Sequence, residues 1–170
     1  MKKVLILDTS ILCVWLRVPG KVTCGPDNDR WTYNRVKEKI DSEIKSGTTL
    51  ILPLASIIET GNHIAQAKGD KHDIVNSFVE HIENALDGTV PWAAFTEQSN
   101  LIGNDALKQT LSSWKETALS GQSLGDALIV AVANYYAKYG SQVEIFTGDE
   151  GLKAFEPSVP TPRIVPRRAR

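Results

Sequence analysis

Three short, largely apolar runs stand out along the chain, at 4–7, 49–52 and 143–146. A run of this length without polar alternation is typical of a β-strand that is buried on both faces, as the strands of a parallel sheet are. Two weaker runs, at 90–95 and 163–165, predict further short strands.

Between these runs, apolar residues recur at the spacing of one helix face. This pattern predicts amphipathic helices at 36–44, 74–86 and 107–118. The segment 127–133 is apolar on all sides, which predicts a central helix packed beneath the sheet. Strands that alternate with helices predict an α/β fold, here a three-layer α/β/α sandwich with a central parallel sheet.

The segment 17–31 breaks both patterns because it is rich in Gly, Pro and Asn. We predict a long surface loop, close to the end of the first strand. Arg17, Lys21 and Arg30 would be its candidates for contact with an RNA backbone. Trp31, which has polar neighbours in the sequence, is a candidate for stacking on a base.

Composition predicts one domain at 1–162 and a basic tail at 163–170. A chain of 170 residues that is 42% hydrophobic is long enough for one packed core. The net charge of −1 is unevenly distributed along the chain. Without the four arginines of the tail, 15 basic and 20 acidic residues remain, which is a net charge of −5. The body is therefore no general polyanion-binding surface, and RNA contacts would come from local patches and from tail residues such as Arg167 and Arg168.

Other classes of protein fit the chain less well. Cys13 and Cys24 lack the spacing of a zinc site and are expected to be reduced structural thiols. The first apolar run ends at Asp8, too soon for a signal peptide or a membrane span. We expect a cytoplasmic protein that does not contact a membrane.

Four carboxylates follow buried strands or begin buried helices. Asp8 and Asp149 come directly after the first and third apolar runs, and Glu59 and Asp126 are expected on the first turns of helices. Because the carboxyl ends of parallel strands line one crevice, these acids are expected to meet there. Like charges raise one another's pKa, so a cluster that stays ionised near neutral pH implies a bound divalent cation.

That cation would be Mg²⁺ or Mn²⁺, which prefer oxygen ligands. We expect Asp8 and Asp126 to be its most direct ligands and Asp149 to be a ligand or to orient a water. Glu59 would be a water-bridged ligand or a general base. His63, four residues after Glu59, is a weaker candidate for a metal pair, because histidines within helices more often pack.

Helix capping is the alternative explanation for each acid taken singly. Ser123 with Asp126 and Ser56 with Glu59 have the spacing of a capping box, and Asp8 or Asp149 would cap the helix that follows its strand. Capping does not, however, predict that all four acids lie along one edge of the sheet.

The blocks Leu-Asp-Thr-Ser, Ile-Ile-Glu-Thr, Gly-Asp-Ala-Leu-Ile-Val-Ala and Phe-Thr-Gly-Asp-Glu-Gly-Leu carry a family resemblance. In this order, and over nearly the whole chain, they resemble PIN-domain ribonucleases, including the VapC-type toxins of bacterial toxin-antitoxin pairs. The resemblance implies a PIN-like fold and a metal-dependent endoribonuclease with one or two Mg²⁺ or Mn²⁺ ions. It also implies support from the hydroxyls of Ser10 and Thr147, an antitoxin partner and a homodimer.

Several alternatives stay open. A phosphatase of the haloacid dehalogenase class needs a second acid two residues after its nucleophile, where Ser10 stands. A PIN-like module that only binds RNA or protein would be expected to lack one of the acids. The chain would also fit an RNA-processing nuclease that is no toxin. A nuclease silenced by a partner would present apolar residues near segment 17–31 or near Ile40.

Overall fold

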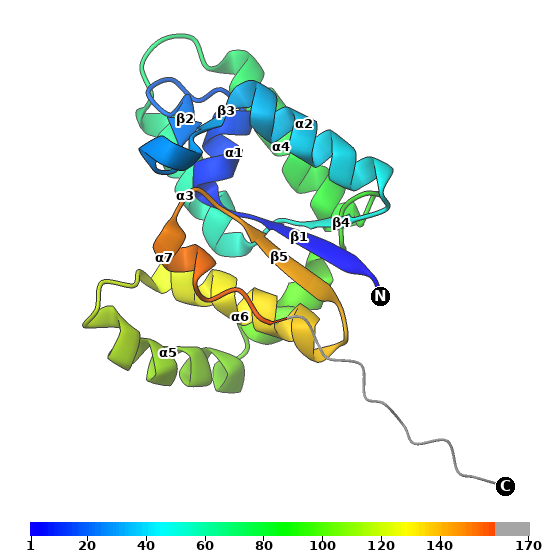
Figure 1. The fold of residues 1–170 in the computed structure, drawn as a ribbon, viewed down its shortest axis with the longest axis vertical. Helices are drawn as coiled ribbons and strands as arrows, with labels where there is room; N and C mark the ends of the chain where they lie inside the picture. The colour runs from blue at the N-terminus through cyan, green and yellow to red at the C-terminus, as the bar shows by residue number, and fades with distance from the viewer. Residues whose placement is uncertain (159–170) are drawn as a thin grey trace, which may run out of the picture.

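The computed structural model describes residues 1–158 (Figure 1). The strand expected at 163–165, the domain boundary at 162 and the basic tail with Arg167 and Arg168 lie outside this part of the chain.

A parallel sheet of three strands forms the centre of the fold. Its strands are β1 (Lys3–Leu7), β4 (Thr49–Ile51) and β5 (Gln142–Phe146), in the order β4-β1-β5. Val4 of β1 pairs with Thr49 on one side and with Val143 on the other. These strands are the three apolar runs of the sequence, so the prediction of a buried parallel sheet is confirmed.

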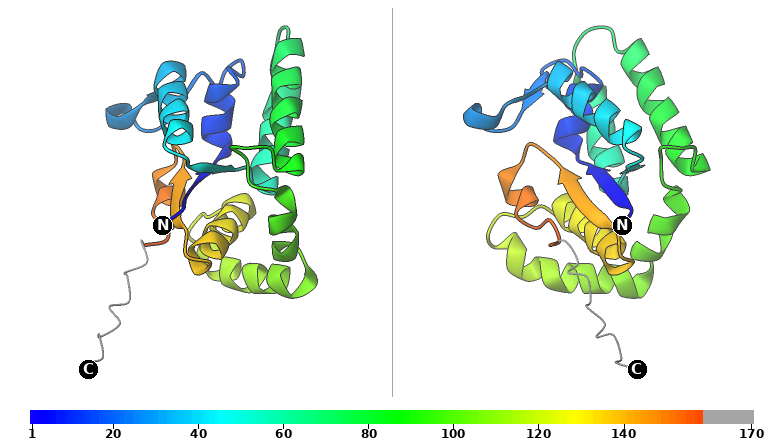
Figure 2. Two further views of the ribbon diagram at one scale, coloured as in Figure 1. Left: turned by 90° about the vertical axis from the view of Figure 1, so that its right-hand side faces the viewer. Right: turned by 45° about the vertical axis from the view of Figure 1, so that its right-hand side comes forward.

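Helices cover both faces of this sheet, because side chains alternate between the faces along each strand. Leu5 and Leu7 of β1 pack in one core with α1, α2 and α4, whereas Val4 and Ile6 pack in a second core with α6. Figures 1 and 2 show α1 and α2 on one side of the sheet and α6 on the other. The predicted mixed α/β fold with helices on both faces is thus confirmed. The helix bounds are α1 Thr9–Trp15, α2 Tyr33–Lys45, α3 Leu54–Gln66, α4 His72–Asp87, α5 Asn104–Ala118, α6 Leu124–Lys138 and α7 Glu150–Lys153.

The apolar run at 90–95 is not a strand. It forms a single bridge between Trp92 and Leu50 at the outer edge of β4. The Leu50 N–H donates to the Pro91 carbonyl at 2.8 Å, and the Ala93 N–H donates to the Leu50 carbonyl at 2.9 Å. Pro91 has no N–H of its own for a longer ladder, and the chain turns into a 3-10 helix, η2 (Phe95–Leu101).

The segment 17–31 is more ordered than a long loop. β2 (Thr23–Cys24) pairs antiparallel with β3 (Trp31–Thr32), and a 3-10 turn, η1 (Asp27–Asp29), lies between them. We call residues 23–32 the β2–β3 hairpin. The predicted exposure is confirmed for most of the segment, which is a surface loop that contains this short hairpin.

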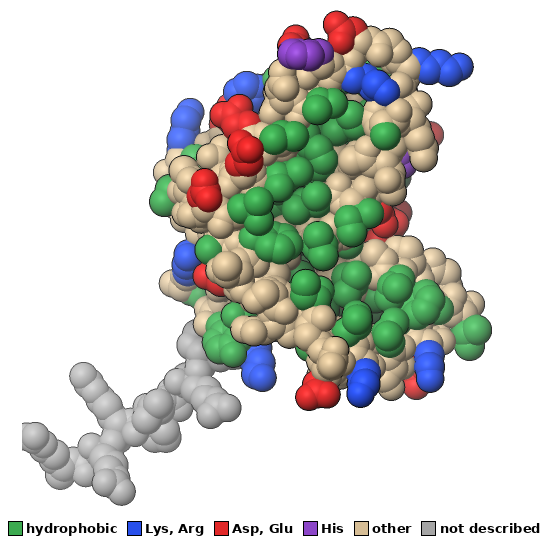
Figure 3. All heavy atoms as spheres, turned by 180° about the vertical axis from the view of Figure 1, so that it is seen from behind, with side chains coloured by type: hydrophobic (Ala, Val, Ile, Leu, Met, Phe, Trp, Pro, Cys, Tyr) green, Lys and Arg blue, Asp and Glu red, His purple; other side chains and the backbone are tan. Residues whose placement is uncertain are grey.

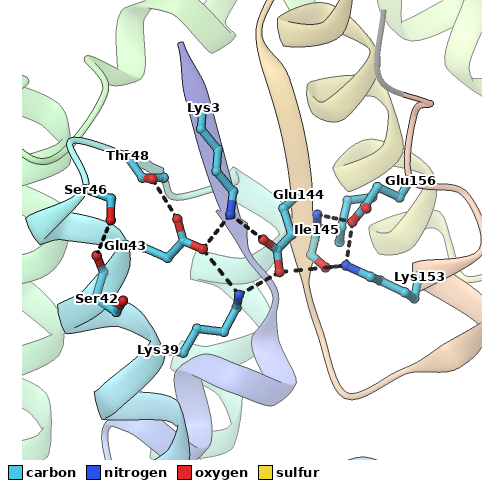
Figure 4. A network of polar contacts seen from close by, with 10 residues as sticks. All are labelled: Lys3, Lys39, Ser42, Glu43, Ser46, Thr48, Glu144, Ile145, Lys153 and Glu156. Atoms are coloured by element: carbon cyan, nitrogen blue, oxygen red, sulfur yellow. Dashed lines mark hydrogen bonds and ion pairs between the residues drawn. The ribbon is translucent and has the colours of Figure 1, made fainter. Parts of the chain in front are cut away.

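A network of lysines and glutamates lies beside the outer strand β5 (Figure 4). Glu144 of β5 pairs with Lys3 at 2.8 Å and with Lys39 at 2.9 Å, and Glu43 of α2 pairs with the same two lysines. We call these four residues the lysine–glutamate network. Burial raises the pKa of both carboxyls, but hydrogen bonds, above all from Lys3, bring each pKa below its ordinary value. The network is therefore a neutralised ionic cluster.

Side chains also occupy the open edge of β5. The Ile145 N–H donates to Glu156 Oε2 at 2.7 Å, and Lys153 Nζ donates to the Ile145 carbonyl at 3.0 Å. An edge strand whose hydrogen-bonding groups are occupied is protected from pairing with another chain. Among the helices of residues 1–158, none has the length and apolar character needed to cross a bilayer.

Candidate functional site

Asp8 lies at the junction of β1 and α1, where it caps the helix. The residue is buried, at 6% exposure. Its Oδ2 accepts hydrogen bonds from the Ser10 N–H at 3.3 Å, from the Ser10 hydroxyl at 2.7 Å and from the Thr147 hydroxyl at 2.7 Å. The hydroxyls of Ser10 and Thr147, which the family resemblance implied as supporting groups, are therefore both in contact with this carboxylate.

The loop after β5 is tied to the same point. The Gly148 N–H donates to Ser10 Oγ at 3.0 Å, and the Asp149 N–H donates to Thr147 Oγ1 at 2.9 Å. The carboxylate of Asp149 caps α7, since its Oδ1 accepts from the N–H groups of Gly151 at 2.7 Å and Leu152 at 3.3 Å. The ends of β1 and β5 thus bring Asp8 and Asp149 to one edge of the sheet.

Glu59 reaches this edge from the second turn of α3, not from its first turn as predicted. The helix begins at Leu54, so Ser56 lies inside it, fully buried, and forms no capping box with Glu59. The Oε2 of Glu59 instead accepts a hydrogen bond from the Thr9 hydroxyl at 3.1 Å. Helix capping therefore does not explain Glu59. Its carboxylate lies beside Thr9, the residue that follows Asp8.

Glu59 also lies against the start of α6. A Cβ atom on Gly125 would lie 2.4 Å from Glu59 Oε1, closer than real Cβ contacts come. Only glycine at this position leaves room for the carboxylate beside the helix terminus that carries Asp126. Glu59 thus links the two chain segments that hold Asp8 and Asp126.

Asp126 has the capping role that the sequence predicted. Its N–H donates to Ser123 Oγ at 3.0 Å, and its Oδ2 accepts from the Ser123 N–H at 3.3 Å, which completes a capping box. Burial raises the pKa of the Asp126 carboxyl, and the charges of Asp8 and Asp149 raise it further against the hydrogen bonds from Ser123. Asp126 therefore caps α6 and also lies close enough to Asp8 and Asp149 for their charges to raise its pKa.

Among the residues that the structure describes, the four acids differ from the lysine–glutamate network in having no basic partner. Within residues 1–158, every ion pair joins other residues, and none includes Asp8, Glu59, Asp126 or Asp149. Converging carboxylates without a counter-charge form a site for a cation in electrostatic terms.

The side chains are not already arranged as a complete ligand set. In the described part of the chain, no three His, Cys, Asp or Glu side chains are placed to hold one ion, and none is so placed with His63. The carboxylates of Asp126 and Asp149 each accept hydrogen bonds, through one oxygen, from backbone N–H groups at the start of a helix.

Two of the basic residues expected to contact RNA have partners within the fold. The Arg17 guanidinium lies 3.7 Å from the centre of the Tyr33 ring, and Arg30 pairs with Asp27. Lys21 is exposed. Nothing in the fold tests a role of these side chains in RNA binding, which stays a prediction.

Trp31 is packed more tightly than its polar neighbours suggested. Its ring meets the Phe146 ring edge-on at 4.8 Å between centres, and the Arg35 guanidinium lies 3.8 Å from its centre. Trp31 is nevertheless half-buried and not enclosed.

The sequence-based predictions did not include the glycines, Gly125 and Gly148, that let the chain segments of the site lie close to one another. A Cβ atom on Gly148 would lie 2.7 Å from both the Cys24 sulfur and the Gly25 nitrogen of the β2–β3 hairpin. The signal was present in the sequence, because Gly125 and Gly148 each directly precede an acid of the site. Both cysteines are free thiols, as predicted.

Exposed apolar side chains gather on another face of the molecule. Ile40 is fully buried, so it cannot belong to the docking face expected around it, although Val22 and Ile44 near the expected places are exposed. Figure 3 shows apolar side chains gathered over the rear face. The exposed apolar residues of α3 and α4 are Ile58, Val75, Val79 and Leu86.

Comparisons of the chain with models of protein families, with curated proteins and with solved structures found no match. The resemblance to PIN-domain ribonucleases thus depends on the motifs of the sequence alone.

Proposed function

We propose that the protein is a metal-dependent endoribonuclease with a PIN-like fold and that Asp8, Glu59, Asp126 and Asp149 form its active site. One observation carries this proposal. Four carboxylates from four chain segments converge at the carboxyl edge of a parallel sheet, and no ion pair neutralises them among residues 1–158. Acids that served only packing or capping would have no reason to lie together.

The donor atoms fit Mg²⁺ or Mn²⁺ in chemistry. All are oxygens, from carboxylates and from hydroxyls, and these ions prefer oxygen ligands while keeping several waters. Asp8, Asp126 and Asp149 would hold the ion, and Glu59 would reach it through a water. When bound, the ion supplies positive charge that stabilises a phosphodiester under attack and lowers the pKa of a bound water.

The protein groups have separable roles in hydrolysis of the RNA backbone. Ser10 and Thr147 fix the Asp8 carboxylate by their hydrogen bonds, so its orientation is set before substrate arrives. Glu59 would accept the proton from the water whose oxygen attacks phosphorus. The bond from phosphorus to the leaving ribose oxygen then breaks, and that oxygen takes up a proton.

We further propose that this nuclease is the toxin of a toxin-antitoxin pair. The motif resemblance supports that role, and the exposed apolar side chains of α3 and α4 support contact with a protein, either an antitoxin or a second copy of the chain. An RNA-processing nuclease would share the site chemistry without an antitoxin. Detection of a small antitoxin that binds the purified protein and stops its cleavage distinguishes the two.

Cleavage of mixed RNA by the purified protein tests the activity. Reactions with Mg²⁺, Mn²⁺ or a chelator are run with the wild type and with Asp8→Asn in parallel. We expect products that require the metal and that are lost in the variant. Equal cleavage by Asp8→Asn would show that the site is assigned wrongly. No cleavage with either metal would favour the PIN-like binding module without catalysis.

A further inference from the structure

A recess lies beside Asp149, between the β2–β3 hairpin, the end of β5 and α7. Its volume is about 460 Å³, within the range of about 300–1,000 Å³ that is usual for ligand pockets. It shares Thr147, Gly148 and Asp149 with the acidic site. A molecule bound in the recess would therefore touch the loop that carries one of the proposed ligands.

Close contacts fix the walls of this recess. Gly148 lies so near Cys24 and Gly25 that no side chain fits between the hairpin and the loop. On the same side, Trp31 packs on Phe146, and Arg35 holds the hairpin through Asp29 at 2.6 Å. A recess with fixed walls binds a ligand without the cost of ordering them first.

The charges that line the recess are mostly neutralised by one another. Glu144 is paired with Lys39 at 2.9 Å, and Lys153 is paired with Glu156 at 2.5 Å. Asp29 is likewise paired with Arg35. The acids that line the recess without an ion pair in the described chain are Asp149 and its neighbour Glu150.

Such a recess suits an uncharged molecule with polar edges and an apolar face. Trp31, Phe146 and Ala154 supply apolar wall, whereas Lys39 and Lys153 supply donors and Glu144 supplies acceptors. A free phosphate would find no unpaired positive charge there, but a nucleobase and its ribose match both features.

We propose that this recess binds the base and ribose of the nucleotide next to the cleaved phosphodiester bond. The inference rests on the proposed nuclease function, which it makes more specific. Because a paired base cannot leave its helix without unstacking, the substrate would be RNA that is single-stranded at this nucleotide. Trp31 would be a residue that determines substrate specificity.

The indole N–H signals of the four tryptophans test the binding directly by NMR. The full-length, ¹⁵N-labelled protein is titrated in chelator with each of the four ribonucleosides, which carry base and ribose without the charged phosphate, and Trp31→Phe assigns the Trp31 signal. We expect the Trp31 signal to shift with at least one ribonucleoside and the Trp114 signal to stay fixed. A Trp31 signal that no ribonucleoside moves would overturn the proposal.

Cleavage kinetics add a second readout. For Trp31→Leu we expect KM to rise about tenfold with little change in kcat, the loss typical of one base–aromatic contact. Trp31→Phe keeps an aromatic ring and should retain most of the affinity, and Trp114→Leu, in helix α5, is the matched control. An unchanged KM in Trp31→Leu would contradict the proposal, whereas the wild-type NMR titration decides it if that variant does not fold.

The two proposals fail in different ways. If the wild type cleaves no RNA while a ribonucleoside still shifts the Trp31 signal, the nuclease function is wrong and the recess remains a nucleoside site. If the wild type cleaves RNA while the signal is fixed and KM is unaffected, the function stands and the recess is assigned wrongly.

Discussion

Two groups of carboxylates lie close to the same sheet but have different surroundings. In the lysine–glutamate network, hydrogen bonds from lysines bring the pKa of Glu43 and Glu144 below the ordinary value. At the edge formed by the ends of β1 and β5, burial and neighbouring acids raise the pKa of Asp126. Hydrogen bonds from lysines therefore favour the ionised form of Glu43 and Glu144, whereas burial and the charges of Asp8 and Asp149 disfavour the ionised form of Asp126.

This difference separates acids that serve stability from acids that are available for chemistry. A paired carboxylate in the network holds β5 against α2, and loss of one carboxylate leaves Lys3 and Lys39 with a single shared partner. Among the four site acids, the charges of Asp8 and Asp149 disfavour the ionised form of Asp126, and a cation bound there would relieve this repulsion. Clusters of unpaired acids are uncommon in a folded core because repulsion must be offset elsewhere, which is the physical reason to assign function to this one.

The largest effect should appear when one carboxylate of each group is replaced by the corresponding amide. Asp126→Asn is expected to lower metal-dependent RNA cleavage by at least about 100-fold, beyond the 10–100-fold usual for a residue that only supports a metal ligand. Glu43→Gln removes a charge from the network and should leave the rate within about threefold, because Glu43 lines neither the acidic site nor the recess and ion pairs close to the surface contribute little. Initial rates on one RNA preparation measure both. Equal losses in the two variants would show that the comparison has no functional meaning.

A smaller loss is expected from Gly125→Ala. The added methyl group would meet the end of the Glu59 side chain, which can move aside, so the fold should persist while the carboxylate leaves its place. We expect cleavage to fall about 10–100-fold, as for other residues that orient a site. Gly103→Ala is the control, because its Cβ would make only an ordinary contact of 3.6 Å. Circular dichroism verifies the fold of both variants, and an unchanged rate in Gly125→Ala would argue against a role for Glu59.

The sequence predicted those parts of the fold that depend on apolar pattern alone. The strands at 4–7 and 143–146 were evident because both faces of these strands are largely buried, and the helices because their apolar residues recur at the spacing of a helix face. The run at 90–95 was misread because apolar pattern does not report pairing, which here stops after one bridge near Pro91. The hairpin at 23–32 escaped detection because its strands are only two residues long.

The candidate site was predictable in its residues but not in its geometry. Acids after strands indicate a common edge, and Asp8 and Asp149 do meet there through Ser10 and Thr147. The capping of Asp126 was also readable from spacing, whereas Glu59 was misplaced by one helical turn because Ser56 has the right spacing without being at a terminus. No sequence pattern says which way a carboxylate turns, since that depends on tertiary contacts.

Metal binding should raise the melting temperature of the wild type by a moderate amount. A ligand at 100 times its Kd stabilises the folded state by about 2.7 kcal/mol, or about 5–10 °C for a chain of this size. We expect that shift with Mn²⁺ in the wild type and in Glu144→Gln, and none in Asp8→Asn. Differential scanning fluorimetry with and without chelator measures it. A full shift in Asp8→Asn would place the ion elsewhere.

The smallest effect concerns stability without metal, and its sign differs between the groups. The folded pKa of Asp126 lies above its ordinary 3.8, so its ionised form weakens the fold above about pH 4, and this cost disappears as the pH falls below that value. The folded pKa of Glu144 lies below its ordinary 4.5, so its contribution is present above pH 4.5 and is lost as the pH falls through the folded pKa. At pH 7 in chelator, Asp126→Asn should therefore melt above the wild type and Glu144→Gln below it. The Asp126→Asn difference should narrow as the pH falls toward 3.8, and the Glu144→Gln difference as the pH falls through the folded pKa of Glu144. A lower melting temperature for Asp126→Asn at pH 7 would show that its capping role outweighs the repulsion among the acids.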